Sequence, residues 1–499
     1  MENINWPGLG MVLIFYLLIF GIGIWAGKSK ENESADDFLL ASRKLPLWIA
    51  ILTMAATWIG GGYINGTAEY AAENGLVWVQ APWGYAMSLI IGGIFFARKM
   101  RRYRFQTMLD PLSQRYGSKA TALFFIPALM GEVFWIAAIL TALGTTFAII
   151  LGLSTEVAII ISAIVAIVYT TIGGLKSVAY TDVLQMAMLV LGLFLVLPFA
   201  LESVGDIDIL WIAYQAKHGA AASLFPSYEI MGNYYWNWWD FALLLMLGGI
   251  PWQVYFQRVL AARTENHAMW LSILAGVICI IVAIPAAMIG MVGGVIDWAS
   301  LGLSGPENAA STLPYVFQHL SSSWVALVGM ATLAAAVMSS IDSSMLSASS
   351  LAGWNVYKPL VRPGLSSEEL AKLVKRIIFI IGTAATILSL QVESVYALWY
   401  LCSDFVYCLL FPALVCALFD PRANRAGAVA GLAVAAFLRF GGGDATLGIP
   451  VLLPYPMVED GVVLFPFRTL AMAAGLGTIM IVSRLTQRFY PPNMLKVCE

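Results

Sequence analysis

The chain has 499 residues, of which 60% are hydrophobic and only 11% carry a charged side chain. Soluble domains contain about 25% charged residues, so this composition excludes a soluble protein and indicates many membrane spans. The formal net charge is −2 at pH 7. A charge so near zero, with basic residues confined to a few loops, argues against a nucleic-acid partner.

Apolar runs of about 20 residues, the length of a membrane-spanning helix, recur along the whole chain. They predict an all-α, polytopic membrane protein of about 13 transmembrane helices, forming a single domain over residues 1–499. The longest connecting loop, residues 202–235, is too short for an appended enzymatic or sensory domain. The apolar runs cover residues 6–26, 46–65, 76–97, 120–150, 155–174, 180–201, 236–258, 268–295, 323–354, 373–391, 394–418, 425–441 and 465–488.

Lys and Arg collect in alternate loops, and basic loops face the cytoplasm. The intervening loops 202–235, 296–322 and 442–464 hold acidic residues and, apart from Lys217, no Lys or Arg. We therefore expect a multi-pass protein of the cell membrane with its N-terminus outside and its C-terminus inside. The basic loop residues are Lys28, Lys30, Arg43, Lys44, Arg98, Lys99, Arg101, Arg102, Arg104, Arg115, Arg258, Arg263, Lys358, Arg362, Lys372, Lys375, Arg376, Arg484, Arg488 and Lys496.

Three successive glycines, residues 60–62, interrupt the second apolar run in the stretch TWIGGGYING. A membrane helix breaks only where the freed backbone is buried or lines a cavity. Five runs later, Gly248, Gly249 and Pro251 interrupt another span. Transporters built from inverted repeats break matching helices in both halves, so this spacing favours a substrate site at the two breaks. Ordinary Pro/Gly kinks are the alternative.

Aromatic side chains accompany these breaks at the depth of the membrane midplane. Trp58 precedes the first break and Trp252 follows Pro251, whereas membrane tryptophans usually lie at the interface. Ring faces attract a quaternary ammonium by about 0.5–2 kcal/mol each and require no hydrogen bond from it. The pattern predicts an aromatic cage for such a cation, with lipid contact or helix packing as the alternative for any single ring.

The run 323–354 contains the stretch AAAVMSSIDSSMLSASS, in which Ser339, Ser343 and Ser347 recur on one helix face. Hydroxyl, carboxylate and freed carbonyl oxygens are hard ligands that suit sodium. Serines alone are equally typical of close helix packing. Asp342 favours the functional reading, because a carboxylate within the membrane is costly, and Asp182 is a second such group.

Three further carboxylates, Glu132, Asp240 and Asp404, lie in or close to apolar runs. We expect each of them to pair with an arginine or a backbone amide. Glu132 stands one helical turn before Trp135, so the alternative for this residue is that it adds negative potential to the cage.

Long stretches of the chain resemble the sodium:solute symporter family: LPLWIAILTMAATWIGGGYINGTAE, TMLDPLSQRYG, IGGLKSVAYTDVLQ, GGIPWQVYFQRVLAA and AAAVMSSIDSSMLSASS. The likeness covers essentially the whole chain and is closest to the choline-transporting branch through ATWIGGGYINGTAE, FIPALMGE and LLLMLGGIPWQ. It implies a LeuT-type 5+5 inverted-repeat bundle that works by alternating access. The implied repeats are residues 46–201 and 236–418, with residues 6–26 and 425–488 as peripheral helices.

The resemblance also implies site residues for sodium-coupled, chloride-dependent choline transport. The choline cage falls on Trp58, Tyr85, Trp135, Trp252 and Trp399. The common sodium site falls on Ala56, Ile59, Ala336, Ser339 and Ser340. A second sodium site falls on Asp182, Asp342 and Ser343, where Asp342 replaces the usual Ser or Thr.

Other functions remain as alternatives. A symporter of the same fold would serve another quaternary ammonium or small solute; an anion would require a cationic residue near the breaks, and the sequence places none there. An enzyme is not expected. His218, His267 and His319 lie in or near loops, and no metal cluster or nucleophile and base pair falls within the spans.

Overall fold

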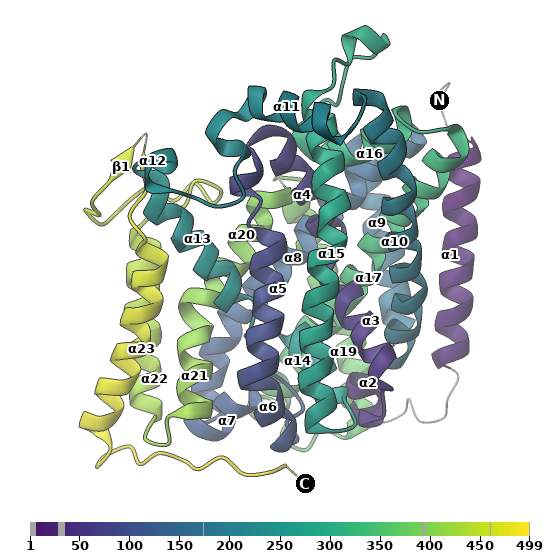
Figure 1. Ribbon diagram of the computed structural model, residues 1–499. Helices are drawn as coiled ribbons and strands as arrows, with labels where there is room; N and C mark the ends of the chain where they lie inside the picture. The colour runs from purple at the N-terminus through teal and green to yellow at the C-terminus, as the bar shows by residue number, and fades with distance from the viewer. Residues whose placement is uncertain (1–5, 28–34, 173, 392–394, 460, 499) are drawn as a thin grey trace.

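The protein is a bundle of long helices, described here by a computed structural model for residues 6–27, 35–172, 174–391, 395–459 and 461–498 (Figure 1). The helices are α1 (Trp6–Gly27), α2 (Ala35–Leu40), α3 (Leu47–Trp58), α4 (Gly61–Glu73), α5 (Ala81–Ile91), α6 (Arg98–Arg102), α7 (Asp110–Tyr116), α8 (Ser118–Leu151), α9 (Thr155–Ile172), α10 (Leu175–Val204), α11 (Ile207–His218), α12 (Tyr228–Met231), α13 (Tyr234–Gly248), α14 (Gln253–Ala261), α15 (Glu265–Val295), α16 (Thr312–His319), α17 (Ser323–Leu351), α18 (Lys358–Leu360), α19 (Ser367–Ser389), α20 (Val395–Phe405), α21 (Phe411–Phe419), α22 (Arg425–Gly441) and α23 (Phe467–Thr486). A small hairpin pairs β1 (Val458–Glu459) with β2 (Val462–Val463).

Every predicted apolar run falls on a helix or a broken helix pair. Among the described residues, 8 helices are long and apolar enough to cross a membrane unaided, and the bent pair α3–α4 makes 9. The other predicted spans are α9, α19 and α22, together with the broken pair α13–α14. Turns of π-helix at Gly92–Ala97, Ala352–Tyr357 and Val406–Leu410 join α5 to α6, α17 to α18 and α20 to α21.

The two ends of the bundle carry different loops. The predicted cytoplasmic segments, with α2, α6, α7 and the chain beyond α23, gather at the lower end in Figure 1. The predicted outer segments, with α11, α12, α16 and the β-hairpin, gather at the upper end. This separation agrees with the predicted topology; which end faces the cytoplasm stays a prediction. The predicted outer N-terminus, residues 1–5, and the basic loop residues Lys28 and Lys30 lie outside the described residues.

The first break bends α3 against α4 by 49°. Its glycines are required by space, because a Cβ on Gly60 would lie 2.8 Å from Ser340 Cβ on α17. A Cβ on Gly61 would overlap the Val337 side chain of the same helix. The glycines therefore allow the broken helix to touch α17, at a place where no larger residue fits.

The second break, residues 249–252, separates α13 from α14 and packs between α5 and α20. A Cβ on Gly248 would lie 2.8 Å from the Ser403 carbonyl oxygen on α20. A Cβ on Gly249 would lie 2.6 Å from Ser88 Cβ on α5. Both breaks are thus enclosed by protein, as unpaired backbone groups at membrane depth require.

Candidate substrate and ion sites

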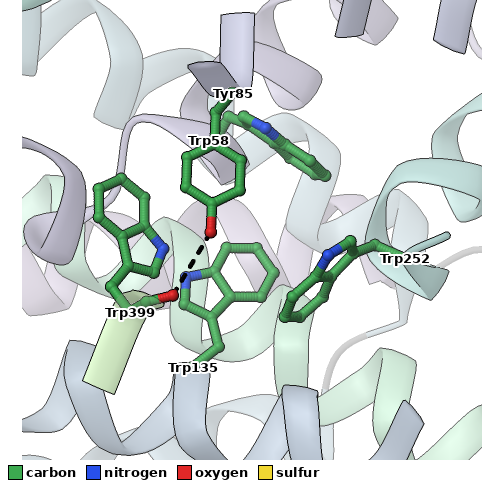
Figure 2. A pocket seen from close by; sticks show the side chains of 5 residues that line it. All are labelled: Trp58, Tyr85, Trp135, Trp252 and Trp399. Carbon is green, nitrogen blue, oxygen red and sulfur yellow. Dashed lines mark hydrogen bonds between the residues drawn. The ribbon is translucent and has the colours of Figure 1, made fainter. Parts of the chain in front are cut away.

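The five predicted cage residues line one cavity at the centre of the bundle (Figure 2). They come from five separate elements: α3, α5, α8, the break before α14, and α20. Each side chain is 6% exposed or less. The Trp135 ring lies 5.8 Å from Trp58 and 5.0 Å from Trp252, and Tyr85 stacks on Trp399 at 4.8 Å, all between ring centroids.

Hydrogen bonds to the protein hold two of these rings in place. Trp252 Nε1 donates to the carbonyl oxygen of Gly248 at 2.7 Å, across the second break. The Tyr85 hydroxyl hydrogen-bonds Ser403 and approaches the Trp399 carbonyl oxygen at 3.5 Å (Figure 2). Trp58 Nε1, by contrast, is buried without a hydrogen-bond partner in the described part of the chain. The cavity therefore presents to a ligand mainly aromatic surface, with one indole N–H.

The cavity is tightly closed. The centre of a water molecule has about 10 Å³ in which to move, which is room for a single water. A quaternary ammonium enters only when the rings separate, so the structure is that of a contracted cage.

Two tyrosines outside the predicted set pack against rings of the cage. Tyr255 lies 6.1 Å from Trp58, and Tyr63 lies 5.6 Å from Trp399. The Tyr63 hydroxyl donates to the Cys279 carbonyl oxygen at 2.9 Å. The sequence does hold a signal for Tyr255, because this residue follows Trp252 by about one helical turn and so lies on the same face of α14.

The predicted common sodium site lies where α3 ends against α17, and hydrogen bonds there involve Ala56, Ala336, Ser339 and Ser340. Ser339 Oγ lies 2.9 Å from the Ala56 carbonyl oxygen and 2.8 Å from that of Ala336. Ser340 Oγ donates to the Thr57 carbonyl oxygen at 2.9 Å, and Ile59 follows at the break. Carbonyls left without helical partners at the end of α3 are thus met by hydroxyls of α17. Thr57 was not predicted.

The predicted second sodium site also comes together, but around an arginine. Asp182 accepts a hydrogen bond from Thr53 and lies 3.5 Å from Arg258 Nη2. The same Nη2 donates to Ser343 Oγ at 2.5 Å, while the Ser343 amide donates to Asp342 Oδ1 at 2.6 Å. A guanidinium on these oxygens opposes the binding of a further cation to them.

Arg258 corrects two expectations. The sequence predicts that Arg258 is a cytoplasmic loop residue and that no cationic residue lies near the breaks. In the structure Arg258 instead lies in α14, the second half of the broken helix, and is fully buried. The reason is electrostatic compensation, since its ion pair with Asp182 offsets the cost of burial. Counting charges along the chain does not reveal this.

The other intramembrane carboxylates divide into two kinds. Asp404 accepts hydrogen bonds from Arg439 at 2.7 Å and from Arg468 at 2.8 Å, and Asp240 accepts from the Thr469 amide at 2.7 Å. Structural pairing is confirmed for these two. It is wrong for Glu132, whose two carboxylate oxygens are buried without a hydrogen-bond partner in the described part of the chain.

Residues 38–435 match the sodium:solute symporter family. The chain belongs to this family. It is 43% identical to the high-affinity choline transporter 1 of Caenorhabditis elegans over 514 residues, covering 98% of this chain and 87% of the relative. It is 44% identical to the human high affinity choline transporter 1 over 506 residues, covering 98% and 86%.

Solved structures show the same fold at low sequence identity. A Na⁺-coupled sialic acid symporter in a substrate-bound outward-open state has a TM-score of 0.80 at 18% identity, covering 99% of both chains. A nucleobase-cation-symport-1 family transporter in a closed conformation has a TM-score of 0.58 at 12% identity, covering 93% of this chain and 97% of that one. The symporter therefore has the predicted LeuT-type bundle. It is a multi-pass, sodium-coupled membrane transporter and not an enzyme.

Proposed function

We propose that this symporter takes up choline by alternating access, driven by sodium. The observation that carries the proposal is the cavity lined by four tryptophans and one tyrosine beside both helix breaks. A trimethylammonium group is attracted to ring faces and donates no hydrogen bond, so it fits such a lining. The similarity to choline transporters of two animals over nearly the whole chain supports the same substrate.

The polar groups of the cavity argue against a sugar. Buried substrate hydroxyls need hydrogen-bond partners. Trp252 Nε1 and the Tyr85 hydroxyl are already bonded to the protein. Trp58 Nε1 has no partner within the described residues, but an indole N–H is a donor only and cannot satisfy several sugar hydroxyls. Another small quaternary ammonium is the alternative substrate, because the same cage would hold it.

We assign the coupling sodium to the carbonyls of Ala56 and Ile59, the Ala336 carbonyl and the hydroxyls of Ser339 and Ser340. These are neutral oxygens, and the two serine hydroxyls reach α3 from α17. A sodium held there would tie the broken helix to α17, so its arrival favours the substrate-ready state and its departure inward releases the substrate.

The second set, Asp182, Asp342 and Ser343, is the alternative sodium site, and an ion there would compete with Arg258. We further propose that residues 46–201 and 236–418 are the inverted repeats. Chloride dependence, which the resemblance implies, is also proposed, and we assign it no residue.

The test is uptake of labelled choline into proteoliposomes under an inward sodium gradient, with and without chloride. Wild-type protein should require sodium. Trp252→Ala should weaken uptake about tenfold or more, because a buried ring face is lost. Trp324→Ala is the matched control, since Trp324 is 81% exposed.

Ser339→Ala should raise the sodium concentration needed for half-maximal uptake and leave choline recognition at saturating sodium nearly intact. The absence of sodium-driven choline uptake by folded wild-type protein would refute the substrate while leaving the family and the fold unaffected.

A further inference from the structure

Glu132 is a carboxylate buried inside the helix bundle. It lies on α8, is 1% exposed, and neither Oε1 nor Oε2 has a hydrogen-bond partner within the described residues. Burying a charged group without a partner is strongly unfavourable, and intramembrane carboxylates are by default functional.

Its neighbours along α8 contact the aromatic cage. Trp135 stands on the same face of α8, three residues further along. A Cβ on the adjacent Gly131 would lie 3.5 Å from Trp252 Cη2 and 3.1 Å from the Cys402 carbonyl oxygen, so α8 is pressed against the cage wall here. The Cys402 thiol donates to the Trp399 carbonyl oxygen at 2.8 Å. The segment of α8 that holds Glu132 thus carries Trp135, lies against Trp252, and contacts Cys402, which is hydrogen-bonded to Trp399.

The carboxylates near the cage outnumber the guanidinium groups that face them. The Glu132 carboxylate acts electrostatically on Cys402 and on Arg258, and Arg258 also faces Asp182 and Asp342. Three carboxylates therefore share one guanidinium. Besides both oxygens of Glu132, Asp182 Oδ1 and Asp342 Oδ2 lack partners within the described residues. A positive charge in the cage would favour the ionised forms of these carboxylates.

We propose that Glu132 is a specificity-determining residue, whose negative charge selects substrates with a net positive charge over neutral or zwitterionic molecules of the same shape. The inference rests on the proposed choline transport and goes beyond it. The rings alone recognise a trimethylammonium group, which choline shares with the zwitterion glycine betaine. Discrimination by net charge requires an ionisable group near the cage, and Glu132 supplies one, because a cation in the cage favours its charged form.

The test compares three ligands on purified wild-type protein and on Glu132→Gln: choline, its neutral carbon isostere 3,3-dimethyl-1-butanol, and glycine betaine. Binding is followed by calorimetry in saturating sodium. Glu132→Gln keeps the shape and removes the charge, so it should weaken choline about tenfold, leave the neutral isostere unchanged and strengthen glycine betaine relative to choline. Glu132→Asp, which retains the charge, should keep the preference for choline.

Glu202→Gln is the matched control, because Glu202 is an exposed carboxylate near the end of α10. Equal weakening of choline and the neutral isostere by Glu132→Gln would show a packing role and overturn the inference. Unchanged binding of all three ligands would overturn it as well. Should Glu132→Gln not fold, Glu132→Met removes the charge at similar length and serves the same comparison. Failure of wild-type protein to bind choline would instead refute the proposed function.

Discussion

The absence of a Cβ at Gly60 permits the contact with α17 on which the proposed sodium site depends. Gly60 has φ −82°, a conformation open to any residue, so glycine is not required here by the backbone. It is required by the approach of α17, because a Cβ would lie 2.8 Å from Ser340 Cβ. The Ser340 hydroxyl that meets the Thr57 carbonyl belongs to this same contact.

Gly60→Ala should therefore separate the break from α17. We expect the free energy of unfolding to fall by about 1–3 kcal/mol, as for other overpacked sites, and the sodium requirement for uptake to rise. Thermal unfolding in detergent and sodium titration of uptake measure the two effects. Gly477→Ala is the control, since nothing lies within 4 Å of a Cβ at this position on α23. Equal behaviour of the two variants would contradict the steric argument.

At the scale of elements, hydropathy predicted the spans because a run of about 20 apolar residues reports directly on a length of helix. The breaks were predictable because glycine and proline are costly in a span. The turns of π-helix were not, since a changed hydrogen-bond spacing leaves no trace in hydropathy. Nor was the burial of Arg258, which depends on Asp182, a residue distant in sequence.

The serine face of α17 illustrates the same limit. Periodicity placed Ser339, Ser343 and Ser347 on one face, and pattern alone does not say what each will meet. Ser339 meets the Ala56 carbonyl of α3, whereas Ser343 and Ser347 meet Arg258 and Gln257 of α14. The serines on one face of α17 thus contact both broken helices, α3 and α14.

The end of the bundle predicted to face the cytoplasm is closed by contacts between the segment before α3 and the end of α14. Gln257 Nε2 donates to the Leu39 carbonyl oxygen at 2.9 Å, and Arg263 Nε donates to that of Lys44 at 3.0 Å. Leu45 forms a bridge to Ala262. In alternating access these contacts must separate before substrate leaves inward.

Arg263→Ala should weaken this closure. The lost hydrogen bond is exposed, so we expect the free energy that favours the closed end to fall by about 0.5–1 kcal/mol. This corresponds to a roughly two- to fivefold faster efflux of choline from preloaded proteoliposomes. Arg422→Ala, which removes an exposed arginine between α21 and α22, should leave efflux unchanged. Slower efflux from Arg263→Ala would show that these contacts favour opening.

Across the whole molecule, burial separates the central helices from the peripheral ones. The window of α17 that would cross the membrane is 78% buried and that of α20–α21 is 94% buried, compared with 24% for α1 and 28% for α23. Arg439 of α22 and Arg468 near the start of α23 pair with Asp404 of α20. These ion pairs fix the peripheral helices to the core, so we infer that α20 moves little relative to α22 and α23.

The charge carried per cycle tests the transport scheme for the molecule as a whole. One sodium and one choline carry two positive charges inward, and each charge gains about 2.3 kcal/mol per 100 mV. A tenfold sodium gradient adds about 1.4 kcal/mol. Simultaneous measurement of current and labelled choline uptake in proteoliposomes should give two charges per choline for the sodium-only scheme. A co-transported chloride would lower the ratio to one and make it depend on chloride. Uptake with no net charge movement would contradict the sodium-only scheme, because neither the sodium nor the choline would then cross uncompensated.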